Sequence, residues 1–193
     1  MQLVILDRDG VINKDSDDYV KSVEEFQLID GSAEAIAHLH KNGFTVVVAT
    51  NQSGLARGLF DLDDLEAMHA KLNDAVIDAG GELSGIFYCP HGPDDGCYCR
   101  KPETGLIDAI EAEFEISAAG SPLIGDSIRD LQAGLDKGCE PILVMTGKGQ
   151  RSLEKLQSSD DDSGIAIDSL PQLRDLRAAA DYIVENYTGD SEA

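Results

Sequence analysis

The residues that decide the fold stand at the amino end, where positions 3–10 read LVILDRDG. Four apolar residues in a row, Leu3 to Leu6, predict a short strand that is buried on both faces, and Asp7 ends it. Side chains two positions apart in extended backbone point to the same side, so Asp7 and Asp9 can face one reaction centre. This stretch therefore predicts a parallel sheet with paired carboxylates at the carboxyl end of one strand.

Strands and helices alternate along the rest of the chain. Short apolar or β-branched runs predict further strands at 45–49, 86–88, 122–124, 141–145 and 165–167. Apolar side chains spaced three and four apart predict helices at about 32–42, 62–79, 106–114, 128–135 and 171–185. The alternation predicts an α/β fold of the three-layer, Rossmann-like kind, in which helices flank a mostly parallel sheet.

The length of 193 residues fits a single domain over 1–193, with a frayed tail at 186–193. The composition is that of a globular protein, with 42% hydrophobic and 27% charged residues. The 15 Lys and Arg against 37 Asp and Glu give a net charge of −22. Such a surface repels phosphate backbones and anionic lipid, so we expect neither a nucleic acid nor a membrane as a partner.

The amino-acid pattern also bears on where the protein works. No apolar run approaches the ~18–20 residues of a membrane-spanning helix, and the amino end lacks the basic segment of a signal peptide. We therefore expect a cytoplasmic protein. A monomer is the default expectation, since nothing in the sequence sets an oligomeric state.

Polar residues stand where the expected strands end. Ligands bind beyond the carboxyl ends of the strands in such a sheet, and these ends read Asp7, Thr50, Cys89 and Asp126. Clustered carboxylates repel one another unless a hard cation lies among them, and Mg²⁺ prefers such oxygen ligands. In so acidic a chain, however, a lone Asp-x-Asp pair is more often an ordinary turn. The pair becomes informative only together with the segments that accompany it.

Three more segments could serve a phosphate group. Residues 50–54 (TNQSG) offer hydroxyl, amide and backbone N–H donors to phosphate oxygens. Arg100 and Lys101 place two adjacent cations in a strongly anionic chain, and residues 125–130 (GDSIRD) add a carboxylate at another strand end. Taken singly, these segments read as a turn, as solvated surface charge and as a capped helix start. Together with the paired carboxylates they favour a phosphate-processing site.

Cys89, His91, Cys97 and Cys99 form a C-x-H…C-x-C set around a turn-forming segment. Three thiols and one imidazole are the ligands of a closed, structural Zn²⁺ site. The alternative is a buried thiol at a strand end and an exposed loop histidine. With zinc, the loop at about 89–101 would owe its shape to the metal, and the metal would position the two cations that follow Cys99.

In this order, four segments resemble the motifs of the haloacid dehalogenase superfamily of phosphotransferases. They are Asp7–Val11, Thr50, Lys101 and Gly125–Asp130, and the resemblance covers about residues 3 to 150. It implies the superfamily's three-layer parallel sheet. The short intervals from Asp7 to Thr50 and from Thr50 to Lys101 leave no room for a large cap domain, so the zinc loop would be a small insertion.

The resemblance implies a catalytic role for four residues. Asp7 would be the nucleophile that forms an aspartyl-phosphate, and Asp9 would protonate the leaving oxygen and then accept the proton of the hydrolytic water. Thr50 and Lys101 would stabilise the transferred phosphoryl group. Members that preserve their aspartyl-phosphate usually carry Thr two positions after the nucleophile, so an Asp there favours a phosphatase.

The resemblance also implies the Mg²⁺ ligands. These would be the Asp7 carboxylate, the backbone carbonyl of Asp9 and the Asp126 carboxylate, with Asp130 in support.

The zinc loop narrows the resemblance to the D-glycero-D-manno-heptose 1,7-bisphosphate phosphatases. The segments that are similar to that family are 19–21, 26–31, 50–58 (TNQSGLARG), 88–91 and 97–102. The family implies hydrolysis of the 7-phosphate of a phosphosugar substrate, on the route to the ADP-heptose of lipopolysaccharide. Beyond the catalytic residues, the implied substrate contacts are Arg8, Asp15, Tyr19, Asn51, Gln52, Ser53, Arg100 and Ser127.

Two other functions stay open at this point. A histidinol-phosphate phosphatase shares the motifs and the zinc loop, and a non-catalytic phosphosugar-binding module could use the same loop. The sequence leaves the preferred anomer at C1 of the sugar open as well.

Overall fold

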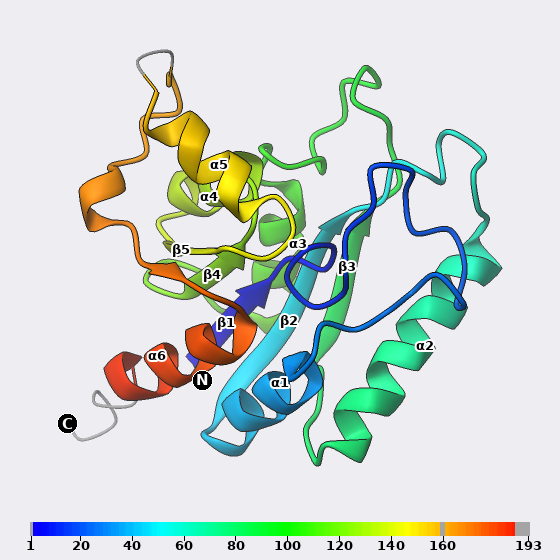
Figure 1. The fold of residues 1–193 in the computed structure, drawn as a ribbon, viewed down its shortest axis with the longest axis horizontal. Helices are drawn as coiled ribbons and strands as arrows, with labels where there is room; N and C mark the ends of the chain where they lie inside the picture. Colours follow the sequence, from blue (N-terminus) through cyan, green and yellow to red (C-terminus); the bar gives the residue numbers. More distant parts are fainter. Residues whose placement is uncertain (1, 159–160, 188–193) are drawn as a thin grey trace.

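The computed structural model describes residues 2–158 and 161–187, and within them the strands form one parallel sheet of six (Figure 1). The strand order is β3-β2-β1-β4-β5-β6. The strands are β1 (Gln2–Leu6), β2 (Phe44–Asn51), β3 (Gly85–Cys89), β4 (Pro122–Gly125), β5 (Glu140–Val144) and β6 (Gln172–Leu173). The α/β class and the parallel sheet are confirmed.

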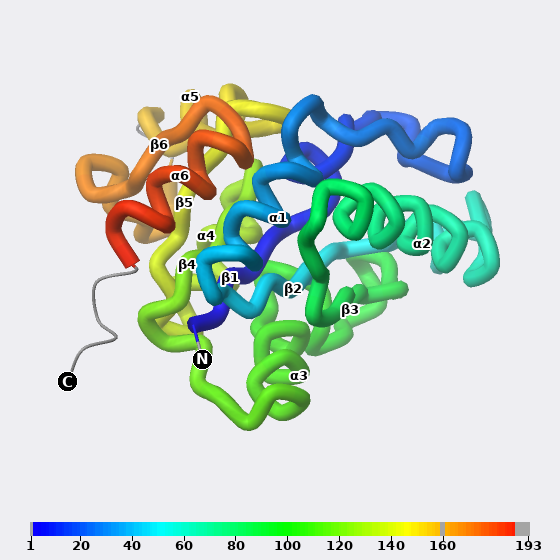
Figure 2. Tube along the Cα trace, turned by 90° about the horizontal axis from the view of Figure 1, so that it is seen from below, coloured from blue at the N-terminus to red at the C-terminus, as the bar shows by residue number. Residues whose placement is uncertain are grey.

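Helices cover both faces of this sheet. They are α1 (Ser32–Lys41), α2 (Leu62–Asp78), α3 (Gly105–Phe114), α4 (Ile128–Asp136), α5 (Gly149–Leu156) and α6 (Leu176–Tyr187). The apolar sides of α1, α2 and α6 share one core with the sheet, and those of α3 and α4 share a second core on the opposite face. Figure 2 shows α1 and α6 on one side of the strands and α3 on the other, which is the expected three-layer arrangement.

The strand β1 is apolar throughout because both of its faces are buried. Val4 and Leu6 belong to the core under α1 and α2, whereas Leu3 and Ile5 belong to the core under α3. In the sheet, β1 lies between β2 and β4, so the chain leaves it toward opposite edges. This is the topological switch point at which open α/β sheets bind ligands. Asp7, the first residue after β1, therefore lies at the place where a ligand site is expected.

Loops rise from the carboxyl ends of the strands. The loop from Asp7 to Gly31 follows β1 and the loop with the cysteines follows β3, and in Figure 1 both lie beyond the arrowheads of the strands. The first loop holds its shape through two isolated bridges, Asp9 with Asn13 and Asn13 with Leu28. No separate cap domain stands in the described residues, in agreement with the expected short intervals.

The structure differs from expectation after β5. The strand expected at 165–167 is wrong, because Ile167–Ser169 form a single 3₁₀ turn and the last strand, β6, comes later. Ile165 and Leu170 are apolar because they pack in a cluster with Leu131 and Leu143, not because they pair in the sheet. The sequence pattern does not predict the helix α5. It is only eight residues long, begins at Gly149 and carries two apolar side chains, which are too few to show a helical spacing.

The final helix also differs in its limits. It starts at Leu176, later than expected, because β6 occupies the preceding residues and the Asp175 carboxylate accepts the Ala178 N–H at 2.9 Å. It continues to Tyr187, so two residues of the expected frayed tail are helical; positions 188–193 lie outside the described residues. None of the described helices combines the length and the apolar character needed to cross a membrane.

Candidate active site

A cavity of about 310 Å³ opens at the carboxyl ends of β1, β2 and β4. It is lined by all the residues for which a catalytic, magnesium-binding or substrate-binding role was predicted. These are Asp7, Arg8, Asp9, Asp15, Tyr19, Thr50, Asn51, Gln52, Ser53, Arg100, Lys101, Asp126 and Ser127. The structure thus brings together segments that lie far apart in the chain.

Lys101 lies at the buried end of this cavity, where it joins two carboxylates. Its Nζ is 2.8 Å from Asp7 Oδ1 and 2.7 Å from Asp130 Oδ1, and it also donates to the Ala49 carbonyl at 2.6 Å. Burial disfavours the charge of Lys101, but Asp130 and Asp7 outweigh it and keep the pKa of the ammonium above its ordinary value. The ammonium is therefore a fixed positive charge beside the Asp7 carboxylate.

Asn51 fixes the backbone of Lys101. The Asn51 amide donates to the Lys101 carbonyl at 3.1 Å, and its oxygen accepts the Lys101 N–H at 3.0 Å. The Asn51 side chain is thus occupied at both ends by this neighbour. For Asn51, the described bonds make it a support of Lys101, and a contact with substrate stays a prediction.

The carboxylates of Asp7, Asp126 and Asp130 form the most anionic part of the site. One oxygen of each lies within 4.8 Å of the others. Burial, with the neighbouring carboxylates, raises the pKa of Asp7 to about 7, although Lys101 opposes the shift. Burial, followed by Asp7 and Asp130, raises the pKa of Asp126 to about 8. The protein alone under-compensates this charge, as expected where a cation binds.

Glycines let the backbone close around Asp126. A Cβ on Gly10 would lie 2.0 Å from Asp126 Oδ2, and one on Gly147 would lie 2.1 Å from the same atom. Both residues have positive φ, and the N–H of Lys148 donates to that oxygen at 2.7 Å. The carboxylate is therefore held in place before any ligand binds, which suits the strict geometry that Mg²⁺ requires.

Asp130 is already engaged through both oxygens. Oδ1 pairs with Lys101, and Oδ2 accepts from Ser127 Oγ at 2.6 Å and from the Ser127 N–H at 3.0 Å. The bond from the Ser127 N–H is one half of a capping box at the start of α4, whose other half joins the Asp130 N–H to the Ser127 side chain. This arrangement fits the predicted supporting role of Asp130 behind the Mg²⁺ ligands.

The Asp9 carboxylate does not belong to this cluster of three and is bonded to other side chains. It accepts from Arg8 at 2.9 and 3.1 Å, from Asn13 Nδ2 at 2.8 Å and from Gln52 Nε2 at 2.8 Å. Burial would raise the pKa of Asp9, but Arg8, Asn13 and Gln52 hold it below its ordinary value. Since these bonds occupy the carboxylate, only the backbone carbonyl of Asp9 is left for a metal, as the resemblance implies.

Arg8 is buried completely, and its guanidinium donates hydrogen bonds to the Asp9 carboxylate. Its guanidinium lies 5.3 Å from the centre of the Phe26 ring, and it also approaches Gln52 and, at 3.4 Å, His69 Nε2. Burial and the Arg8 charge lower the pKa of His69 to about 4, so this imidazole is neutral and can accept. The Arg8 side chain thus orients Asp9, and a contact of Arg8 with substrate stays a prediction.

Thr50 offers a hydroxyl at the end of β2. Its Oγ1 accepts from Gln52 Nε2 at 2.9 Å, which leaves the hydroxyl hydrogen free to donate to a ligand. Gln52 donates to both Thr50 and Asp9, so one amide aligns two predicted catalytic groups.

The loop after β1 forms the outer wall of the cavity. Asp15 Oδ2 lies 2.7 Å from Lys148 Nζ, an ion pair that ties this loop to the segment after β5. Tyr19 takes a positive φ of 66°, rare outside glycine, and its ring lies 5.6 Å from the Arg57 guanidinium carbon. Both predicted contact residues, Asp15 and Tyr19, are thus held over the cavity.

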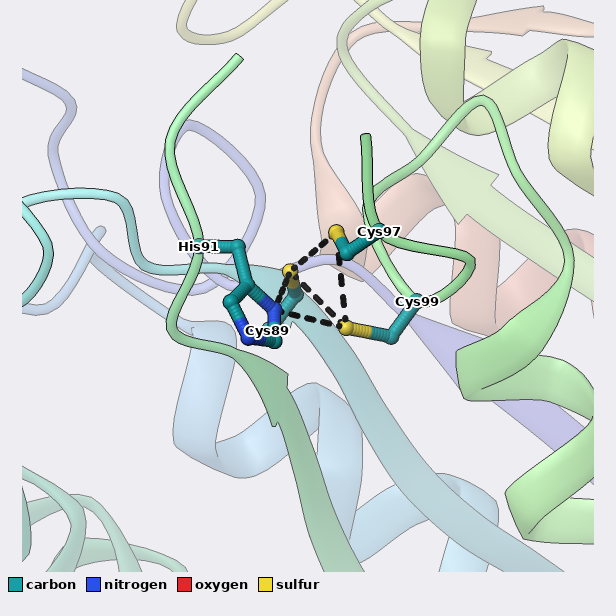
Figure 3. A group of neighbouring side chains, drawn as sticks. All are labelled: Cys89, His91, Cys97 and Cys99. Atoms are coloured by element: carbon teal, nitrogen blue, oxygen red, sulfur yellow. Dashed lines mark hydrogen bonds between the residues drawn. The ribbon is translucent and has the colours of Figure 1, made fainter. Parts of the chain in front are cut away.

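The side chains of Cys89, His91, Cys97 and Cys99 point toward one another, as Figure 3 shows. The sulfur of Cys89 lies 3.6 Å from that of Cys97 and 3.1 Å from that of Cys99, while His91 Nδ1 lies 3.3 and 3.6 Å from two of these sulfurs. A regular tetrahedron with bonds of about 2.3 Å has edges of about 3.8 Å. The four ligand atoms therefore fit a single Zn²⁺, bound through Nδ1 of the histidine.

Comparison with known proteins identifies the family. Residues 98–187 match the HAD-hydrolase-like family model, and residues 2–135 match the model described as polynucleotide kinase 3 phosphatase. The chain is 57% identical over 155 residues to D-glycero-beta-D-manno-heptose-1,7-bisphosphate 7-phosphatase of Pseudomonas putida, which covers 80% of this chain and 89% of that protein. The chain belongs to the heptose bisphosphate phosphatase family.

Further members of the heptose bisphosphate phosphatase family are also similar to this chain. The enzyme of the same name from Escherichia coli is 39% identical over 153 residues, covering 75% of this chain and 80% of that protein. The crystal structure of D,D-heptose 1,7-bisphosphate phosphatase from Bordetella bronchiseptica, complexed with magnesium and phosphate, superposes with a TM-score of 0.87 at 48% identity. It covers 96% of this chain and 99% of that one. The HAD-type fold is confirmed.

Two basic residues line the cavity although the sequence pattern predicts no role for them in the site. Lys148 and Arg129 both line the cavity. Lys148 follows β5, so the rule that ligands bind at the carboxyl ends of strands could have indicated it, had it been applied to that strand. Arg129 lies within the GDSIRD segment, but sequence alone does not show that its side chain faces the cavity.

Proposed function

We propose that this chain hydrolyses the 7-phosphate of D-glycero-D-manno-heptose 1,7-bisphosphate, a step in ADP-heptose and lipopolysaccharide core biosynthesis. Family membership supports the substrate. The observation that carries the chemistry is the Asp7 carboxylate, which stands at the switch point of the sheet with Lys101 2.8 Å away and Asp126 beside it. An anionic nucleophile flanked by fixed cationic charge is what attack on a phosphate requires.

The reaction proceeds through two transfers at Asp7. First, Asp7 Oδ attacks phosphorus, the P–O7 bond breaks, and Asp9 gives a proton to the departing sugar oxygen. This step uses the protonated form of Asp9, whereas Arg8, Asn13 and Gln52 favour the carboxylate form that the second step uses. Asp9, now a carboxylate, then accepts a proton from water as that water attacks the aspartyl-phosphate and releases inorganic phosphate and free Asp7. The bonds from Arg8 and Gln52 keep Asp9 in position for both steps.

Thr50 and Lys101 bind the oxygens of the phosphoryl group during both transfers. The free hydroxyl hydrogen of Thr50 and the Lys101 ammonium are donors fixed by Gln52 and by Asn51, so little reorganisation is needed as charge develops.

Two metals belong to the proposal. Mg²⁺, held by Asp7, the carbonyl of Asp9 and Asp126, supplies charge neutralisation for the phosphoryl group when bound. Zn²⁺, held by the loop cluster defined by Cys89, His91, Cys97 and Cys99, has a structural role because four protein ligands leave no open position.

The site also bears on the alternative functions. A complete set of predicted catalytic side chains in one cavity favours an enzyme over a non-catalytic binding module. Histidinol phosphate carries an ammonium group, whereas Arg100 and Arg129, which line the cavity without a carboxylate partner among the described residues, favour a second anionic group. The net charge of −22 disfavours a polynucleotide, despite the name of one matching family model.

The small-molecule substrate, the cytoplasmic location and the monomeric state that were expected from the sequence complete the proposal.

Phosphate release tests the proposal most simply. We would compare heptose 1,7-bisphosphate, fructose 1,6-bisphosphate and histidinol phosphate in the presence of Mg²⁺. We expect kcat/KM for the heptose bisphosphate to exceed the other two by at least about 100-fold, which corresponds to about 2.7 kcal/mol. A preference for histidinol phosphate would contradict the proposed substrate but not the proposed phosphoryl transfer through Asp7.

A further inference from the structure

Basic side chains in the cavity fall into two groups. The cavity is lined by Arg8, Arg100, Lys101, Arg129 and Lys148. Three of them are neutralised by carboxylates of the same cavity: Arg8 by Asp9, Lys101 by Asp7 and Asp130, and Lys148 by Asp15. Arg100 and Arg129 have no carboxylate partner within residues 2–158 and 161–187. In a chain with 37 acidic residues, this leaves two guanidinium groups lining the cavity without a carboxylate partner. The groups that favour the Arg100 charge are the thiols of Cys89 and Cys97 and the hydroxyl of Tyr19.

Arg100 and Arg129 reach the same place from different elements. Arg100 follows the last zinc-loop cysteine, and its one described bond is a long one of 3.4 Å to the His91 carbonyl. Arg129 stands in the first turn of α4, directly before Asp130. Both also line the neighbouring hollow beside the zinc loop, which Gly92 helps to form. The two side chains thus lie where the cavity and this second hollow adjoin.

Two guanidinium groups that share a hollow repel each other unless an anion lies between them. A phosphate is well suited to that position, because the planar donor fork of arginine matches two phosphate oxygens. The phosphate that reacts lies deeper in the cavity, at Asp7 and Lys101. A second phosphate on the same sugar must therefore lie toward the mouth.

We infer that Arg129, together with Arg100, binds the second, non-reacting phosphate of the substrate and so gives the enzyme its preference for a sugar bisphosphate over a monophosphate. The inference rests on the proposed function and adds Arg129 as a specificity-determining residue. Among the described residues, no hydrogen bond or ion pair joins Arg129 to Asp7 or Lys101, so its charge acts on substrate binding and leaves the transfer at Asp7 unaltered.

The test compares two substrates that differ in one phosphate. We would measure kcat/KM for heptose 1,7-bisphosphate and for heptose 7-phosphate with the wild type, Arg129→Ala and Arg129→Lys. For Arg129→Ala we expect a loss of about 10- to 100-fold on the bisphosphate, seen in KM, and less than about two-fold on the monophosphate. Arg129→Lys keeps the charge without the fork and should lie between. The matched control is Arg174→Ala, an arginine paired with Asp175 on the surface.

Each outcome separates this inference from the proposed function. If the wild type prefers the bisphosphate and Arg129→Ala keeps that preference, the inference is overturned and the function stands. An equal loss on both substrates would also overturn it, because Arg129 would then support folding or catalysis. If the wild type shows no preference for the heptose bisphosphate, the proposed function fails, and the inference fails with it.

Discussion

The Lys101 ammonium donates to Asp7 Oδ1 at 2.8 Å, although the two residues are 94 positions apart in the chain. The same ammonium lies 2.7 Å from Asp130, and Asn51 holds its backbone. One cation thus compensates two buried carboxylates at the switch point of the sheet. Lys101 consequently serves the stability of the site as well as its chemistry.

Replacing Lys101 should therefore affect folding and activity together. In Lys101→Met, Asp7 and Asp130 lose their partner, which for a buried pair costs about 3–5 kcal/mol in the free energy of unfolding. Activity should fall by about 100- to 1,000-fold, as for loss of a donor to the developing charge. Thermal unfolding without metal and steady-state kinetics check this. Lys155→Met, an exposed residue of α5, is the control, and equal stability of the two variants would contradict the account.

The pKa values of the carboxylates predict an unusual pH dependence of stability. Without metal, the pKa values of Asp7 and Asp126 are about 7 and 8, against about 4 in the unfolded chain. Between these values the folded state binds more protons than the unfolded state, so these two groups make stability fall as pH rises from about 4 to 8. Mg²⁺ should reverse this effect, since it binds the charged carboxylates.

The variant Asp126→Asn isolates the contribution of the Asp126 carboxylate to the pH dependence of stability. The amide keeps the shape of the carboxylate and removes its charge. We expect the variant to be more stable than the wild type at pH 8 without metal, to equal it near pH 4, and to gain little from Mg²⁺. Calorimetry or denaturant unfolding at the two pH values would measure the difference. A variant less stable than the wild type at pH 8 would show that the carboxylate charge is already compensated.

The role of Asp9 as a general acid can be tested with two substrates whose leaving groups differ in their need for a proton. Asp9→Asn cannot protonate the departing oxygen, so kcat/KM for the sugar phosphate should fall by about 100-fold or more. For p-nitrophenyl phosphate the loss should be much smaller, because p-nitrophenolate departs without a proton. Asp17→Asn, an exposed carboxylate at the mouth with 83% of its side chain accessible, is the control. Equal losses on both substrates would exclude a general acid at position 9.

Removal of the zinc ligands should change the loop more than the sheet. We expect one Zn²⁺ per chain by elemental analysis, and none in Cys97→Ser. This variant should lose substrate affinity, since Arg100 and Lys101 follow the cluster directly, while its far-ultraviolet circular dichroism stays that of the wild type. Cys139→Ala removes a buried thiol outside the cluster and should retain the metal. A metal-free wild type with freely reactive thiols would contradict the assignment.

The strand-end residues could be predicted from the sequence because their chemistry and their position are both local. A buried apolar run ending in Asp7, or β-branched residues ending in Thr50, places a polar group at a sheet edge without knowledge of any distant contact. The cluster of Cys89, His91, Cys97 and Cys99 could be predicted for the same reason, since all four lie within eleven positions of one another.

Other features depend on contacts that the sequence does not display. Arg129 is informative only because it lines one cavity with Arg100 and neither guanidinium has a carboxylate partner among the described residues. That relationship depends on how α4 and the cysteine loop lie next to each other, which the sequence does not display. The contact of His69 with Arg8, the residue that orients Asp9, requires α2 to lie against the first loop. The apolar residues at 165–170 pack against α4 and α5, and a local pattern cannot tell this packing from pairing in a strand.

The central claim is that phosphate leaves from O7 and not from the anomeric position. Phosphorus NMR of heptose 1,7-bisphosphate with enzyme and Mg²⁺ tests it directly, because the phosphate on the CH₂ group and the phosphate on the anomeric carbon couple to different numbers of protons. The account predicts that the first signal is replaced by inorganic phosphate while the anomeric signal persists, and that Asp7→Asn changes neither. Loss of the anomeric signal, or full turnover by Asp7→Asn, would contradict it.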